Sequence, residues 1–135
     1  MSPGSHTVHL RTMAHSPVQS VFWRIVWASL LTGVVIGSLL PGDSPVMKEL
    51  DSLAINDKIE HFLAYAGLAF LPTLHETVAK LRGFLALAAI MGVLLELGQL
   101  LVPGRTCDVY DALADGAGIL GGFLLGLAIR ATIKS

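Results

Sequence analysis

The chain has 135 residues, of which 53% are hydrophobic and only 14% are charged, and its mean hydropathy is +0.69. This balance lies outside the usual range of soluble proteins and indicates an integral membrane protein with one domain. The formal net charge of -1 gives no reason to expect a nucleic-acid partner.

The first 21 residues are polar and aperiodic, so we expect an N-terminal tail over 1–21 and a single transmembrane domain over 22–133. The first apolar run covers 22–40, which is long enough to cross a hydrocarbon layer of roughly 30 Å as a helix. Trp23 and Trp27 suit a membrane interface.

A polar, acidic connection follows over 41–56. It predicts a short surface helix between Pro45 and Leu53, and Asn56 is a plausible N-cap for the helix after it.

Three further apolar runs cover 57–74, 83–102 and 111–129, joined by a basic turn over 75–82 and a loop over 103–110. Helices are expected, because an open strand leaves backbone groups unpaired in lipid and four short runs cannot close a barrel. The predicted fold is therefore all-α, a polytopic integral membrane protein with a four-helix transmembrane bundle.

The distribution of basic residues predicts the orientation in the cell membrane. Six lie with the termini and the middle loop, and three lie in the other two loops: Arg11, Arg24, Lys80, Arg82, Arg130 and Lys134 against Lys48, Lys58 and Arg105. This bias favours both termini in the cytoplasm. Nearly all the acidic residues, Glu76 excepted, then lie toward the extracytoplasmic side.

Helical spacing predicts which polar side chains share a face, at 100° per residue. In the second predicted helix an arc of about 100° holds Asp57, Lys58, His61 and Tyr65, whereas Glu60 points elsewhere. In the third predicted helix, Glu96 and Gln99 share an arc of about 80° with the small residues Ala89 and Gly92.

In the fourth helix the acidic residues lie on a stripe of small residues, about 80° wide: Asp111, Asp115, Gly118, Gly122 and Gly126. Small-xxx-small spacing marks a face where another helix packs closely. Asp111 and Asp115 are therefore expected to face the bundle interior.

Depth points the same way, because His61 and Asp115 each lie about 6 Å inside their helices and Glu96 about 10 Å before Pro103. A carboxylate inside a spanning helix costs roughly 2.5–3.5 kcal/mol on insertion scales. His61, Glu96 and Asp115 lie at one depth in three different helices, which predicts a single site. We expect the side chains of His61, Glu96, Arg105 and Asp111 within about 10 Å of one another.

At these residues the sequence resembles the VanZ-like membrane proteins. The resemblance covers about 25–130 and is carried by DKIEHFLAY from Asp57, by ELGQLLVPGR with Glu96, Gln99 and Arg105, and by Asp108, Asp111, Gly118 and Gly122. Asp115 departs from the pattern, because the family commonly has Asn there. The resemblance implies an integral envelope protein of four or more helices, in a family named for a member that confers low-level resistance to teicoplanin.

Structural interpretations of the same residues remain open. His61 can be a packing histidine bonded to Asp57 or Tyr65, and Arg105 can be a surface partner of Asp108. Glu96 with Gln99 can hold helices together, and the glycines serve helix packing.

Three classes of function follow. In an enzyme, the catalytic candidates are Glu96, His61 and Asp111, with Lys58 and Arg105 holding a phosphate or carboxylate of an envelope lipid or peptidoglycan precursor. Further substrate-binding candidates are Asp57, Tyr65, Gln99, Asp108 and Asp115. No known hydrolase signature is present.

In a transport or binding protein, the carboxylates and His61 hold a proton or a divalent cation, and in a scaffold the polar cluster only locks the helices. The sequence favours a VanZ-like envelope protein that binds or modifies an envelope lipid or peptidoglycan precursor, and leaves open both catalysis and the identity of any metal.

Overall fold

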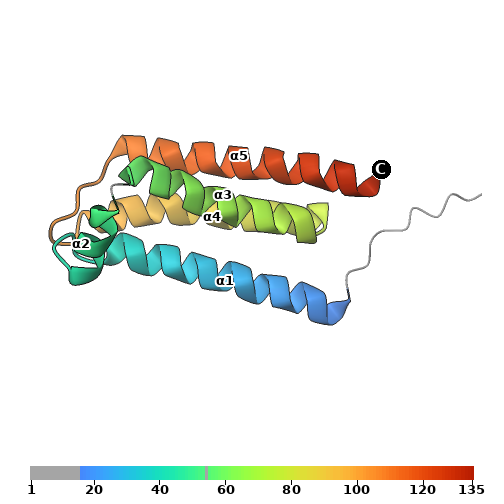
Figure 1. Cartoon of the computed structure of the whole chain (residues 1–135), viewed down its shortest axis with the longest axis horizontal. Helices are drawn as coiled ribbons and strands as arrows, with labels where there is room; N and C mark the ends of the chain where they lie inside the picture. Colours follow the sequence, from blue (N-terminus) through green and yellow to red (C-terminus); the bar gives the residue numbers. More distant parts are fainter. Residues whose placement is uncertain (1–15, 54) are drawn as a thin grey trace, which may run out of the picture.

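The computed structural model describes residues 16–53 and 55–135. Within them the chain forms five helices, α1 (Pro17–Leu39), α2 (Pro45–Ser52), α3 (Asp57–His75), α4 (Val78–Gln99) and α5 (Val109–Lys134). The four long helices lie side by side, and α2 lies across one end of the bundle together with the loop between α4 and α5 (Figure 1). We call this end the α2 end.

The structure is all-helical across the described residues, as predicted. Among the described residues, three helices are long and apolar enough to cross a membrane, namely α1, α4 and the segment Val109–Ile133 of α5. Helix α3 is not among them, and Asp57, Lys58 and Glu60 occupy its first turn.

The predicted short helix and N-cap are confirmed. Helix α2 begins at Pro45, and the side chain of Ser44 caps it by accepting a hydrogen bond from the backbone N–H of Met47. The side chain of Asn56 caps α3 by accepting from the backbone N–H of Lys58 at 2.9 Å.

Several predicted boundaries are wrong, and α5 ends at Lys134, five residues beyond the expected end of the fourth apolar run. Helix α1 begins at Pro17, five residues before the expected start, because Ser16 caps it and proline suits the first helical position. The remainder of the expected tail, 1–15, lies outside the described residues. Helix α4 begins at Val78, because the strong helix formers after Thr77 extend it through most of the expected basic turn.

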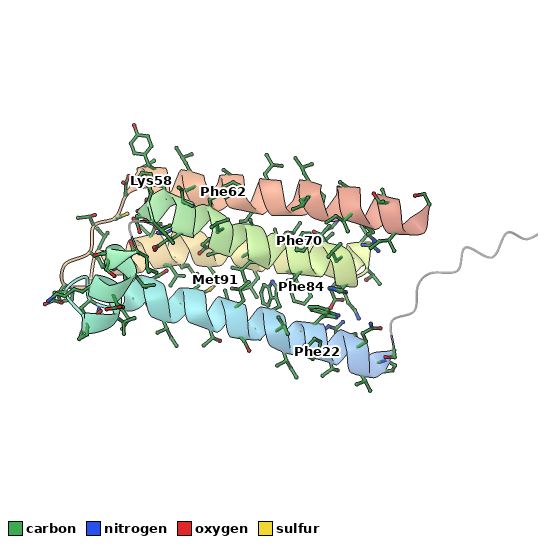
Figure 2. The ribbon with its side chains drawn as sticks, in the orientation of Figure 1. Phe22, Lys58, Phe62, Phe70, Phe84 and Met91 are labelled. Carbon is green, nitrogen blue, oxygen red and sulfur yellow. The ribbon has the colours of Figure 1, made fainter. Side chains whose placement is uncertain are left out.

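The apolar core lies between α1, α3 and α4. Trp27, Tyr65, Leu68 and Ala88 form it, and the indole N–H of Trp27 donates to the backbone carbonyl of Leu68 at 2.7 Å. Phe84 packs edge-on against Trp27, and Figure 2 shows it between α4 and α1. Buried indole N–H groups need such a partner, so this bond fixes α1 against α3.

Helix α5 packs directly on the backbone of α3. A Cβ atom on Gly118 would collide with the carbonyl oxygen of Phe62, and one on Gly122 would collide with that of Ala66. Gly126 lies against the side chain of Thr73. Only glycine leaves room for backbones this close, which is the usual role of small residues between membrane helices.

A polar cluster fixes the end of the bundle opposite α2. The guanidinium of Arg24 in α1 binds both carboxylate oxygens of Glu76, at 2.6 and 3.0 Å, and Arg130 in α5 donates to the backbone carbonyls of Thr73 and Glu76. Trp23 stacks on His75 with ring centroids 4.1 Å apart. These contacts join α1, α3 and α5 at the end of the bundle opposite α2.

Replacing Gly122 by leucine should lower the amount of protein in the membrane and its melting temperature, because the side chain cannot fit against the carbonyl of Ala66. Quantitative blots and melting curves in detergent measure both effects. Gly116→Leu is the matched control, since a Cβ atom at Gly116 on the same helix meets nothing within 4 Å. Equal loss in both variants would mean that the close packing of α5 on α3 is not what stabilises the bundle.

Candidate functional site

Two Pro-Gly loops meet at the α2 end. The backbone N–H of Gly42 donates to the carbonyl of Pro103 at 3.2 Å, and Gly104 has a φ of +73°, a conformation that favours glycine. This contact brings the loop before α5 to the C-terminus of α1.

Arg105 closes the end of α1. Its Nε donates to the carbonyl of Leu40 at 3.0 Å and its Nη2 to that of Gly37 at 2.7 Å, so the guanidinium satisfies carbonyls that a helix C-terminus leaves unpaired. Nη2 also lies 3.2 Å from the sulfur of Met47 in α2. Arg105 therefore connects three segments of the chain.

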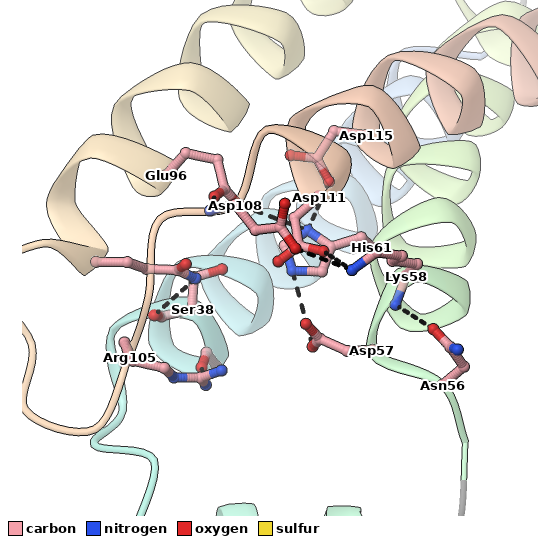
Figure 3. A network of polar contacts seen from close by, with 12 residues as sticks. Ser38, Asn56, Asp57, Lys58, His61, Glu96, Arg105, Asp108, Asp111 and Asp115 are labelled. Atoms are coloured by element: carbon pink, nitrogen blue, oxygen red, sulfur yellow. Dashed lines mark hydrogen bonds and ion pairs between the residues drawn. The ribbon is translucent and has the colours of Figure 1, made fainter.

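His61 is the centre of the polar cluster, with carboxylates facing both ring nitrogens (Figure 3). Nδ1 lies 2.7 Å from Oδ1 of Asp115 in α5 and 3.9 Å from Oε1 of Glu96 in α4. Nε2 lies 4.0 Å from Oδ1 of Asp57, one turn earlier in α3. Residues from three helices thus meet at one imidazole.

Three of the carboxylates are buried. Glu96, Asp111 and Asp115 are each 4% exposed, which is rare for acidic residues unless they are paired. Glu96 accepts a long hydrogen bond of 3.4 Å from the backbone N–H of Asp108. Burying several carboxylates together is costly, so cations or protons are needed close by.

Lys58 supplies part of the compensating charge. Its ammonium group lies 3.1 Å from Oδ2 of Asp108 and 3.1 Å from Oδ1 of Asp111. The alternative interpretation, in which Arg105 is a surface partner of Asp108, is wrong, because Asp108 pairs with Lys58 while Arg105 binds the end of α1.

A cavity of about 130 Å³ opens beside this cluster, between α1, α2 and α3. One side of its lining is apolar, with Val34, Met47 and Leu50, and another part carries the polar residues Asp57, Glu60, His61, Tyr65, Gln99 and Arg105. Gln99 is held in place by donating to the carbonyl of Ser38 in α1 at 3.3 Å. The cavity therefore offers both an apolar surface and charged groups to a ligand.

The candidate residues predicted from the sequence all lie at this end of the bundle. Direct contacts join Asp57, Lys58, His61, Glu96, Asp108, Asp111 and Asp115, while Tyr65, Gln99 and Arg105 line the adjoining cavity. Glu96 is buried in the bundle and does not face lipid.

Other residues of the site were missed. Glu60 was expected to point elsewhere, but it lines the cavity. Met47 and Leu50 of α2 also line it. Their spacing of three residues on a short amphipathic helix was a signal that this face packs on the bundle.

Two overlapping sets of side chains offer atoms suitable for a metal ion. Asp57, His61 and Asp111 form one set, and His61, Glu96 and Asp115 form the other. Within each set the ligand atoms lie within 4.8 Å of one another.

The structure thus defines a small helical protein with membrane-spanning helices and a charged site at one end. The VanZ/LLP1 family matches residues 6–130, which is nearly the whole chain, and the chain belongs to this family. The resemblance noted in the sequence is therefore confirmed. Among curated proteins and among solved structures, no match to the chain was found.

Asp108 lies just before the apolar segment Val109–Ile133 of α5, so its carboxyl group is outside the membrane-spanning part. The backbone N–H of Tyr110 and then the ammonium of Lys58 stabilise its carboxylate, which lowers the pKa of Asp108 below its ordinary value. Because the folded pKa is lowered, this stabilisation is present above the ordinary aspartate pKa of about 3.9 and is lost as the pH falls through the folded value.

Asp108→Asn should therefore make the melting temperature less dependent on pH between about pH 5 and 2, because the amide cannot be protonated in this range. Melting curves over this range measure the change. Asn still accepts the hydrogen bond at the start of α5, so this cap should survive. An acid dependence as steep as that of the unmodified protein would exclude Asp108 as a contributor.

Proposed function

We propose that this protein is a four-span cell-envelope protein whose cavity binds the head group of an envelope lipid or of a lipid-linked peptidoglycan precursor on the extracytoplasmic side. The observation that carries the proposal is the mixed lining of the cavity beside the charged cluster.

The fourth crossing is assigned to α3. Its 19 residues extend about 28 Å at 1.5 Å per residue, close to the thickness of the hydrocarbon layer. Helices α1, α4 and α5 all contact it, and its polar residues His61 and Tyr65 face protein, while the exposed Asp57 and Lys58 lie in its first turn. The low hydropathy of α3 therefore does not prevent a buried position in the bundle.

An even number of crossings fits the placement of the helix ends. The start of α1 and the end of α5 both lie away from α2 (Figure 1). The Lys/Arg bias favours the cytoplasm for that end, and Lys80, Arg82 and Arg130 lie on helices near it. The α2 end then faces outward, where lipid-linked precursors of the cell wall are used.

A ligand with an apolar and a polar part fits the cavity best. Val34, Met47 and Leu50 offer contact to an acyl or prenyl chain, and Arg105 offers charge to a phosphate or carboxylate. Two of its nitrogens bind carbonyls of α1, and within the described residues Nη1 makes no hydrogen bond. Lys58 is bound to two carboxylates, so we now assign the role of holding an anion to Arg105 and not to Lys58.

Leucine and valine side chains around α2 support access from the bilayer. Val46, Leu50 and Leu53 are each at least 36% exposed, and they lie on or next to the short helix that lines the cavity. An amphipathic helix with this composition suits the membrane interface. A lipid can then reach the cavity from the outer leaflet, which supports a link to glycopeptide resistance, the property for which the family is named.

Reporter fusions test the orientation. Fusions at Ser135 and in the turn at Glu76 and Thr77 should report the cytoplasm, and fusions at Leu50 and Thr106 should report the outside, because of the six-to-three Lys/Arg bias. A cytoplasmic signal at Thr106 would overturn the proposed topology and remove the site from the outer leaflet.

Substitutions test whether the cluster acts in function or only in folding. Glu96→Gln and Asp111→Asn should keep membrane abundance and melting temperature near or above those of the unmodified protein, because each removes charge repulsion in a crowded acidic site. Both should abolish any change in teicoplanin susceptibility that expression of the protein confers. Blots, melting curves and susceptibility assays measure the three properties.

Glu49→Gln is the matched control, since it removes an exposed carboxylate from α2 at the same end of the bundle. It should change none of the three properties. If the Glu96 and Asp111 variants instead lose protein as Gly122→Leu does, the cluster serves as a scaffold that only joins the helices.

A further inference from the structure

We propose that Asp57, His61 and Asp111 bind a divalent transition-metal ion such as Mn²⁺ or Zn²⁺, and that Asp115 holds His61 in the orientation that binding needs. The site goes beyond the proposed lipid ligand, and its test does not require that ligand.

Asp115 fixes the orientation of the His61 ring. Nδ1 lies 2.7 Å from Oδ1 of Asp115, a buried carboxylate that can only accept a hydrogen bond when ionised. The proton of a neutral imidazole therefore belongs on Nδ1. This leaves the lone pair of Nε2 directed toward Asp57, at 4.0 Å. Metal-binding histidines commonly have this arrangement, in which the second nitrogen donates to a carboxylate.

The groups around Nε2 are all acceptors. One carboxylate oxygen from Asp57 and one from Asp111 lie within 4.8 Å of a ring nitrogen of His61 and of each other. Two carboxylates and a lone pair repel one another unless a proton or a cation lies between them, and a metal ion can replace such a proton. Ligand atoms of one metal ion are about 3 Å apart, given bonds of about 2.1 Å, so small side-chain movements close the site.

Lys58 does not provide this cation. It binds Oδ1 of Asp111 together with Asp108, on the α5 side of the cluster. Asp111 also lies within hydrogen-bond distance of Asp57 on the His61 side, and two carboxyl groups in such contact share a proton or hold a cation.

Tyr65 gives an independent indication of a polar ligand. The residue is 2% exposed, it lines the cavity next to His61, and its hydroxyl makes no hydrogen bond within the described residues. Among the described residues no fully buried side-chain oxygen or nitrogen lacks a partner, so the hydroxyl of Tyr65 is open to the cavity, where water or a polar ligand can bind it. Water on a metal ion, or an oxygen of a head group held by the ion, supplies such a partner here.

The mixture of ligand atoms indicates which metals fit. One imidazole nitrogen with carboxylate oxygens suits Zn²⁺ and Mn²⁺, whereas Ca²⁺ and Mg²⁺ are bound through oxygen atoms. Asp57 and His61 belong both to this site and to the lining of the cavity. A bound ion would therefore place positive charge where a phosphate head group can reach it.

Mn²⁺ binding to the purified full-length protein in detergent tests the proposal. Electron paramagnetic resonance should show one bound ion per chain, and melting curves should show stabilisation that rises with the concentration of Mn²⁺. Zn²⁺ should displace the bound Mn²⁺. If neither ion binds with this stoichiometry at millimolar concentration, the proposal is wrong.

Two variants and a control separate binding from folding. Asp57→Asn should weaken binding at least tenfold, and it should fold normally because Asp57 is exposed and an amide can still donate a hydrogen bond to Asp111. Asp115→Asn should weaken binding about 10–100-fold, as loss of an orienting carboxylate does. Glu49→Gln should bind as the unmodified protein does.

Unchanged affinity in Asp57→Asn would overturn the site as assigned. The outcome is separate from that for the proposed function: bound Mn²⁺ with no effect of the protein on teicoplanin susceptibility supports the metal site and contradicts the resistance role.

Discussion

The close packing of α5 on α3 is the constraint on which the site depends. Gly118 and Gly122 let the two backbones touch, so the first turns of α5 lie against the first turns of α3. Asp111 then reaches Lys58, and Asp115 reaches His61. A larger residue in the stripe would separate the helices, and the buried carboxylates would lose the cations that compensate their charge.

The two ends of the bundle differ in how their charges are arranged. At the end away from α2, Arg24 and Glu76 bind each other through two hydrogen bonds, and Arg130 satisfies backbone carbonyls. At the α2 end, carboxylates outnumber the cations near them, and a cavity adjoins the cluster. The paired charges hold the helices together at the end away from α2, whereas the excess negative charge beside the cavity at the α2 end favours binding of a ligand or a cation.

Much of the candidate site could be predicted from helical spacing. His61, Glu96 and Asp115 have matching depth in three helices, and an apolar bundle must bring such residues together or leave them unpaired. The partners were harder to predict. One interpretation of the sequence paired Arg105 with Asp108. Arg105 instead binds the carbonyls of Gly37 and Leu40, because the contact between the two Pro-Gly loops places it at the end of α1. A contact of this kind has no periodic signal in the sequence.

The sequence by itself determined the membrane class, the helices, the start of the short helix at Pro45, the cap at Asn56, and the polar faces, because hydropathy and helical periodicity act over short distances along the chain. Only the tertiary structure decided that α2 covers the cavity, that Glu60 joins its lining, and which cation meets which carboxylate. These features depend on how distant segments pack, and a side chain several ångströms long can reach any of several partners until that packing is fixed.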